Sequence, residues 1–205
     1  MFENREEAGM KLAQKLENLI TENTIILAIP RGGVNIGYEI SKKYNVPLDV
    51  VIVKKIGHPR NPEYAIGAVS VDSNFINPQH VKLSEDYLRS KIMEKQDEAS
   101  DRYEELRGDK PPLNLKDKQV IIVDDGMATG ATMKMAVQVV KNKNPEKVIV
   151  AIPVTSPSAV DSLKEVADEV IAILEPENFM ALGQFYRDFS QVPTDEAKKL
   201  LERVQ

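Results

Sequence analysis

Short unbroken apolar runs alternate along the chain with segments whose apolar residues recur every three or four positions. Unbroken runs are typical of strands buried on both faces, and the wider spacing is typical of the helices that cover them. Strands are expected at Thr24 to Ile29, Leu48 to Val53, Val120 to Val123, Lys147 to Ile152 and Val170 to Leu174. Helices are expected at 3–20, 36–44, 83–107, 133–140, 156–166 and 194–204. The pattern predicts an α/β fold with a mainly parallel, doubly wound sheet flanked by helices.

Residues 56–68 interrupt this alternation, because they are polar and contain two prolines between bounding glycines. A long loop is expected there. The stretches 65–71 and 75–76 then indicate a hairpin or a third strand, with a turn at Asp72 to Asn74. The helix expected over 83–107 is interpreted as a packing helix or a dimer helix.

Two adjacent carboxylates, Asp124 and Asp125, follow the strand at Val120 to Val123 and precede a loop of small residues. Free amides at the start of the next helix, together with the hydroxyls of Thr129 and Thr132, would surround an anion. Carboxylates beside a phosphate would repel it, so this pair is expected to accept hydrogen bonds from hydroxyls or to face a cation. The run therefore indicates a ribose 5-phosphate site; the alternative is an ordinary turn between a strand and a helix.

A second candidate loop, Pro30-Arg31-Gly32-Gly33, also follows a buried strand directly. Its two glycines allow backbone amides to approach a ligand closely, and Arg31 adds a planar donor. Lys54 and Lys55 are expected to close the strand that begins at Leu48 and to face the same ligand. The alternatives are simple turn chemistry for the glycines and a solvated pair of lysines.

Composition narrows the class of protein. The 205 residues include no cysteine, which excludes disulfides, thiolate metal sites and a cysteine nucleophile. A net charge of −5 argues against broad nucleic-acid binding, and no apolar run approaches membrane-spanning length. We expect a soluble, cytoplasmic protein with one domain over 1–205.

The run from Val120 to Thr132 resembles the signature with which type I phosphoribosyltransferases bind phosphoribosyl diphosphate (PRPP). The resemblance implies that Asp124 and Asp125 hold the ribose hydroxyls. It implies that the 5-phosphate is bound by Ala128, Thr129, Gly130, Ala131 and Thr132, although Ala131 stands where the family often has a second glycine. The other loop is similar to the family's diphosphate loop, which often holds an unusual peptide bond. Diphosphate binding is thus expected at Arg31, Gly32, Gly33, Lys54 and Lys55.

The same resemblance implies a five-stranded sheet of order 3-2-1-4-5 with a small hood. The loops after the first and fourth strands would then face each other across one crevice. Residues 56–68 stand in the place of the family's flexible catalytic lid. The candidate catalytic residues are Asp124, Asp125, Lys54, His58 and Arg60. Residues 175–205 stand in the place of the hood and tail, where Phe179 is expected either to stack on the base or to pack on the core.

A more detailed likeness is to the uncharacterised bacterial and archaeal phosphoribosyltransferase-domain proteins, which share Ile-Pro-Arg-Gly-Gly-Val and the Gly-x-Pro-x-Asn-Pro-Glu loop. It implies a homodimer that transfers the 5-phosphoribosyl group from PRPP to a nitrogenous base in nucleotide metabolism. Diphosphate would be released, with Mg²⁺ held mainly by PRPP and water. The family's 6-oxopurine enzymes carry a lysine where this chain has Pro153-Val154-Thr155. The alternatives are a PRPP-binding regulatory protein without turnover and a relative of PRPP synthases.

Overall fold

Five parallel strands form the central sheet of the computed structural model, which describes residues 1–80 and 83–204. Their order is β2-β1-β6-β7-β8, and every neighbouring pair is parallel. The strands are β1 (Thr24–Ala28), β2 (Leu48–Val50), β6 (Gln119–Val123), β7 (Lys147–Val154) and β8 (Glu169–Leu174). The predicted α/β class is therefore confirmed, as is the adjacency of β1 and β6, the strands that precede the two candidate loops.

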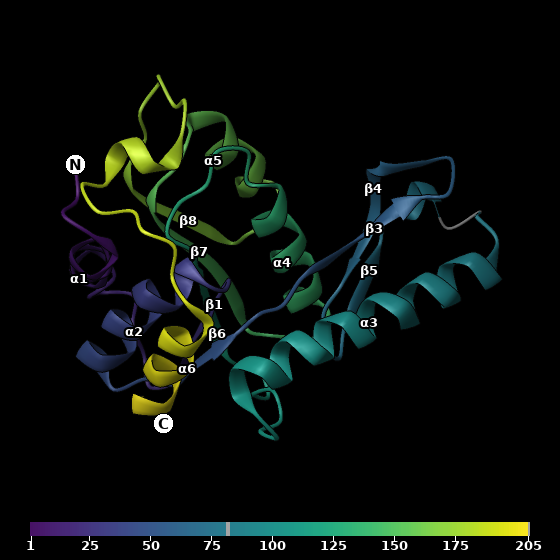
Figure 1. Cartoon of the computed structure of the whole chain (residues 1–205), viewed down its shortest axis with the longest axis horizontal. Coiled ribbons are helices and arrows are strands. Elements are labelled where there is room, and N and C mark those ends of the chain that lie inside the picture. The colour runs from purple at the N-terminus through teal and green to yellow at the C-terminus, as the bar shows by residue number, and fades with distance from the viewer. Residues whose placement is uncertain (81–82, 205) are drawn as a thin grey trace.

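Helices cover both faces of this sheet, because alternate residues of each strand enter two separate apolar cores. Ile26, Ile121 and Ile149 pack on one side, while Leu27, Ile122 and Val150 pack on the other. The first core also takes α1 (Arg5–Lys15), α2 (Gly32–Tyr44) and α6 (Thr194–Arg203). The second takes α4 (Ala131–Lys141) and α5 (Pro157–Lys164), as Figure 1 shows. Burial on both faces explains why these strands are apolar throughout.

Several predicted boundaries are wrong by a few residues. The first helix ends at Lys15 rather than near residue 20, and β2 stops at Val50 instead of Val53. The strand β7 continues through Pro153, because Val154 still pairs with Leu174 of β8. Ser156 caps α5 as expected, since its side chain accepts from the amide of Ala159.

An arm projects from the core and consists of a second, antiparallel sheet and one long helix (Figure 1). Its elements are β3 (Lys54–His58), β4 (Asn61–Val69), β5 (Asn74–Ile76) and α3 (Glu85–Arg107), with a short 3₁₀ turn at Pro78–His80. Tyr87, Leu88 and Ile92 of α3 pack on Ile56 and Ile66 of the sheet. The interpretation of 83–107 as a packing helix is confirmed.

The arm corrects two predictions. Residues 56–68 are not a loop, because most of them form the β3–β4 hairpin. The hairpin expected over 65–76 is confirmed, because β4 pairs antiparallel with β5. These strands do not extend the central sheet, so the order 3-2-1-4-5 is wrong; β8 supplies the fifth strand instead. Lys54 and Lys55 consequently begin β3 and do not close β2.

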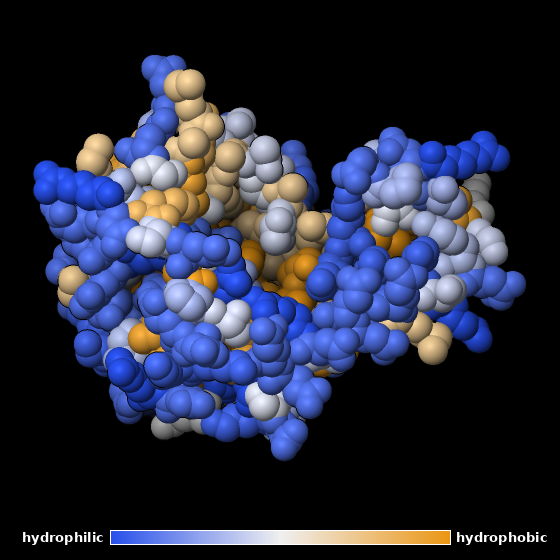
Figure 2. All heavy atoms as spheres, viewed as in Figure 1, coloured by the Kyte–Doolittle hydropathy of each residue, from blue (hydrophilic) through white to orange (hydrophobic). Residues whose placement is uncertain are grey.

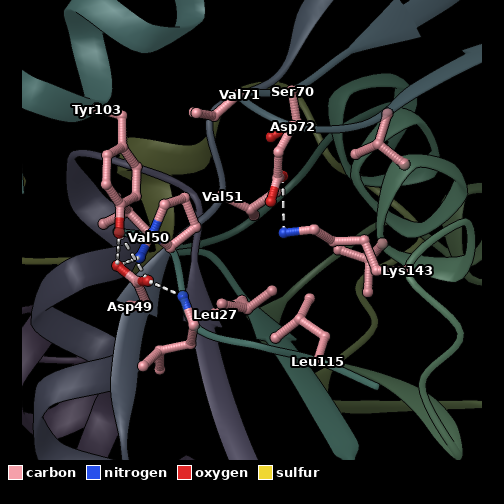
Figure 3. Close-up of a pocket in the computed structure, with 14 residues that line it drawn as sticks. Leu27, Asp49, Val50, Val51, Ser70, Val71, Asp72, Tyr103, Leu115 and Lys143 are labelled. Atoms are coloured by element: carbon pink, nitrogen blue, oxygen red, sulfur yellow. Dashed lines mark hydrogen bonds and ion pairs between the residues drawn. The ribbon is translucent and has the colours of Figure 1, made fainter. Parts of the chain in front are cut away.

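The base of the arm is fixed to the core by buried polar contacts around a small cavity of about 20 Å³ (Figure 3). Asp49 of β2 accepts hydrogen bonds from the Tyr103 hydroxyl, at 2.9 and 3.0 Å, and from the Leu113 amide. Its Oδ1 also lies 2.9 Å from Arg107 Nε, and both side chains are almost completely buried. Across the cavity, Lys143, which follows the end of α4, pairs with Asp72 at 2.7 Å. These contacts tie α3 to β2 and tie the β4–β5 turn to the end of α4.

The C-terminal segment, residues 175–193, passes over the carboxyl end of the sheet and meets the N-terminus. The amide of Phe2 donates to the carbonyl of Phe185, and the amide of Arg187 donates to the carbonyl of Phe2. A short 3₁₀ turn, Leu182–Phe185, lies in this segment. Within the part of the chain that the structure describes, no helix has the length and apolar character needed to cross a bilayer.

Candidate active site

The two candidate loops lie against each other at the carboxyl ends of β1 and β6. A Cβ added to Gly33 would lie 2.8 Å from the Val123 carbonyl oxygen, and one added to Gly32 would lie 1.9 Å from Asp125 Oδ2. No side chain fits at either position, so both glycines are required for this close approach. The peptide bond between Pro30 and Arg31 is cis. The two loops therefore meet at the carboxyl edge of the sheet, as predicted. We call the place where they meet the crevice.

The loop from Ala128 to Thr132 leads into the N-terminus of α4. Gly130 has a φ of 70° and precedes the helix, whose first bond runs from the Lys134 amide to the Gly130 carbonyl at 2.8 Å. The amides before Lys134 are therefore not used within the helix. The loop is largely exposed, and the first turns of α2 and α4, like that of α5, contain no acidic residue. Such an end of a helix suits an anion.

The acidic pair is held in two different environments. The amide of Asp125 donates to Asp124 Oδ1 at 2.8 Å, and burial together with the charge of Asp125 raises the pKa of Asp124 well above its usual value. Asp125 instead has a cation, because Arg5 Nε lies 2.6 Å from its Oδ2. Burial therefore disfavours the charged form of Asp124, while the side chain of Asp125 is ion-paired.

Three residues that support this pair come from the ends of the chain and were not predicted. Arg5 lies in the first turn of α1, while Tyr186 and Phe189 lie in the C-terminal segment. The Tyr186 hydroxyl donates to the Asp125 carbonyl oxygen at 2.5 Å, and burial raises the pKa of that hydroxyl. The sequence holds one signal for Arg5: a cation in the first turn opposes the helix dipole, which indicates a tertiary partner.

The basic residues expected near the diphosphate lie mostly in the arm. Lys54 Nζ is 3.5 Å from Glu98 of α3, and Lys55 Nζ is 3.1 Å from Glu63 of β4. His58 ends β3, where its Nδ1 accepts from the amide of Arg60 at 3.1 Å. Arg31 immediately precedes α2, beside the acidic pair. The structure thus places Arg31 between β1 and α2, next to Gly32, and the other four basic residues on the β3–β4 hairpin of the arm.

Phe179 follows β8 and is only partly buried. Its ring packs on that of Phe185, with 5.2 Å between centroids, and against the first apolar core.

Figure 2 shows an apolar hollow between the core and the arm, bordered by hydrophilic residues. In the described residues, no group of three or more histidine and carboxylate side chains is arranged to hold a metal ion.

Comparison with known proteins agrees with this geometry. The family model described as "Phosphoribosyl transferase domain" matches residues 2–190. A protein of Mycobacterium tuberculosis (strain CDC 1551 / Oshkosh), named "Putative phosphoribosyl transferase MT0597", is 37% identical over 208 residues. That match covers 100% of this chain and 47% of the mycobacterial protein, so the chain spans about half of the relative's length.

Solved structures share the fold. The protein TT1426 from Thermus thermophilus is 38% identical, with a TM-score of 0.88 and 98% of both chains covered. The purine phosphoribosyltransferase from Pyrococcus horikoshii superimposes with a TM-score of 0.50 at 20% identity, covering 91% of this chain and 88% of that one. The latter likeness concerns the fold alone. By its family match and its relatives, this chain belongs to the phosphoribosyl transferase domain family.

Proposed function

We propose that this chain transfers the 5-phosphoribosyl group from PRPP to a ring nitrogen of a base and releases diphosphate. The observation that carries the proposal is the contact of the Gly32–Gly33 turn with Asp124 and Asp125, because it joins two anion-binding loops around a carboxylate pair. PRPP has that chemistry, with phosphate groups at both ends of a sugar diol. The proposal includes cytoplasmic action as a homodimer in nucleotide metabolism.

In this proposal the 5-phosphate lies on the amides and hydroxyls of Ala128 to Thr132, at the positive end of α4. The diphosphate lies on the turn at Gly32 and Gly33, with Arg31 as a bidentate donor. Asp124 and Asp125 accept hydrogen bonds from the ribose hydroxyls. The negative pair also stabilises the positive charge that develops on the sugar ring.

The reaction breaks the bond between C1 and a diphosphate oxygen and forms a bond between C1 and nitrogen. Diphosphate leaves with the electron pair, the ring nitrogen loses its proton, and the sugar passes through an oxocarbenium-like state. Mg²⁺, which keeps several waters and takes substrate oxygens, would be held mainly by PRPP and water. Bound Mg²⁺ would neutralise charge on the diphosphate. The residues of this chain act by positioning and by electrostatics.

In this proposal, the arm supplies further basic residues for catalysis. Lys54, Lys55, His58 and Arg60 lie on the hairpin that takes the place of a catalytic lid, and movement of this hairpin toward the core would bring positive charge to the departing diphosphate. The acceptor base would lie between the C-terminal segment and the sheet, near Phe179. Val154 and Thr155 are fully buried there and offer no cation for a purine oxygen. We therefore propose an acceptor other than a 6-oxopurine.

The proposal is tested in two stages. Titration calorimetry with PRPP and Mg²⁺ should show binding, and a panel of nitrogenous bases should then include one that supports release of diphosphate. If PRPP produces no heat, the proposed site is wrong. If PRPP binds but no base supports release, the regulatory alternative replaces the enzyme.

A further inference from the structure

Arg5 joins three segments that are far apart in the sequence. Its Nε lies 2.6 Å from Asp125 Oδ2, and its Nη1 donates to the carbonyl oxygen of Ser190 at 2.7 Å. The guanidinium carbon also lies 4.0 Å from the centre of the Phe189 ring, which is a cation–π distance. The side chains of Arg5 and Asp125 are each only 12% exposed. The ion pair between Arg5 and Asp125 is directional, because the guanidinium group is planar, and this group also keeps its charge.

The contact fixes which carboxylate oxygen remains for a ligand. Asp125 Oδ2 is enclosed by Arg5 and by the backbone of Gly32, whose added Cβ would lie 1.9 Å away. The other oxygen, Oδ1, is not held by Arg5 and in this proposal accepts a hydroxyl, while the neighbouring carboxyl of Asp124 also interacts with the Asp125 side chain. Arg5 therefore orients Asp125 as well as neutralising it.

The contact also offsets the repulsion within the pair. Two adjacent carboxylates of like charge resist ionising together. Asp124 has a raised pKa because of burial and of its neighbour's charge, and Arg5 opposes that rise. The Tyr186 hydroxyl also faces the pair, and Asp188 lies near Arg5 in the C-terminal segment. The positive charge of Arg5 acts on all of these groups.

The C-terminal segment holds Arg5 in place. Phe189 packs on Tyr186, with 5.0 Å between ring centroids, and Tyr186 itself donates to the backbone of Asp125. Ser190 supplies the carbonyl that orients the guanidinium. A displacement of this segment would remove both supports of Arg5 at once.

We propose that Arg5 is a positioning residue, which sets Asp125 for the ribose diol and makes that setting depend on the folded C-terminal segment. This inference rests on the proposed function. Arg5 acts through Asp125 and does not itself need to touch PRPP. The ribose end of the site and the region proposed for the base are thereby coupled.

The test compares Arg5→Met with Arg187→Met by titration with PRPP and Mg²⁺ between pH 5 and pH 8. Arg187 is a matched control, because it joins the same chain ends through Glu3 at 2.6 Å but is largely exposed and does not touch the acidic pair. We expect Arg5→Met to weaken PRPP binding about tenfold or more, the scale of one charged hydrogen bond. Arg187→Met should stay within about twofold of the wild type, since exposed ion pairs contribute little.

The pH dependence separates positioning from simple folding. Arg5 opposes the rise in the pKa of Asp124. Without this cation the PRPP affinity of Arg5→Met should therefore begin to fall at a higher pH than in the wild type as the solution is acidified. Arg187→Met should keep the wild-type profile, and Arg5→Lys should restore part of the affinity. A merely structural role would lower the melting temperature and leave the profile unchanged.

Two outcomes would overturn the inference while leaving the proposed function intact: equal PRPP affinity in the Arg5→Met and Arg187→Met proteins, or an unchanged pH profile in Arg5→Met. Absence of PRPP binding by the wild type would instead remove the proposed function. If Arg5→Met does not fold, Phe189→Leu gives the result, because it removes the ring that supports the guanidinium and keeps apolar bulk. We then expect a loss of about two- to fivefold, the scale of a cation–π contact, and unchanged affinity would contradict the inference.

Discussion

The crevice between the two loops and the tip of the arm hold their charged side chains in different ways. In the crevice, Asp125 is fixed by Arg5 through its side chain and by Tyr186 through its carbonyl oxygen. At the tip, residues 61–65 are exposed, and the partner of Lys55 is Glu63, whose side chain is 92% exposed. The first set of charges is preorganised by burial, whereas the second set is largely solvated.

This difference indicates a division of roles. In the proposed function, the charges that hold the sugar in one geometry lie where burial restricts their movement, although burial costs stability. Charges that would assist a departing group only during the reaction can remain solvated on a hairpin. The base of the arm resembles the crevice rather than the tip, because Asp49, Tyr103 and Arg107 are almost entirely buried there.

The largest effect is expected at the base of the arm. Replacing Asp49 by Asn removes the charge beside buried Arg107, and loss of one partner of a buried ion pair costs about 3–5 kcal/mol. Urea denaturation should show this decrease in the free energy of unfolding. The matched change Tyr103→Phe removes only a hydroxyl that donates to Asp49, and should cost about 1 kcal/mol. Equal and small effects would mean that the arm is not fixed at its base.

In the crevice, Asp125→Asn should weaken PRPP binding by about 1.5–3 kcal/mol, because it removes a charged acceptor for the ribose hydroxyls. Calorimetry with PRPP and Mg²⁺ measures the change. Wild-type binding and turnover in this variant would mean that the acidic pair has no part in the mechanism. The proposed division of roles between the crevice and the tip of the arm would then be wrong.

The change Asp124→Asn should increase the stability of the fold, whereas Asp49→Asn should decrease it. Because the folded-state pKa of Asp124 is raised, its charge destabilises the fold as pH rises through that pKa. We expect the variant to be more stable than the wild type at neutral pH, by on the order of 1 kcal/mol, while PRPP binding weakens. The gain should disappear below about pH 4, where the carboxyl is protonated in both states. Thermal unfolding across this pH range checks the sign.

The smallest effect on stability is expected at the tip of the arm. Arg60→Ala should change the free energy of unfolding by no more than about 0.5 kcal/mol, because Arg60 is exposed. Its proposed role predicts a fall in the rate of diphosphate release with PRPP affinity nearly unchanged. A large loss of stability would show that the tip is as firmly held as the crevice.

Much of the candidate site could be predicted because it is local in sequence. The order of strand, acidic pair, small-residue loop and helix is complete within Val120 to Thr132, and a strand followed by a helix puts the loop at the carboxyl edge of the sheet. The adjacency of β1 and β6 then follows from the family's topology and is confirmed.

The arm was predicted less well, for a physical reason. The first half of β4 is exposed on both faces, so the alternation that marks a half-buried strand is missing. The two prolines of this region also suggested a loop. Pro62 is tolerated because β5 pairs only with Gly67 to Val69, which leaves that part of β4 as an edge strand with a bulged register toward β3.

The sequence by itself determined the α/β class, the two candidate loops and the residues that compose them, because each depends on apolar periodicity and on short-range turn chemistry. Only the tertiary structure decided which cation reaches Asp125, since Arg5 lies 120 positions away. Only it decided that 54–76 form a separate sheet. Contacts between distant segments depend on how whole elements pack, and no local pattern encodes that packing.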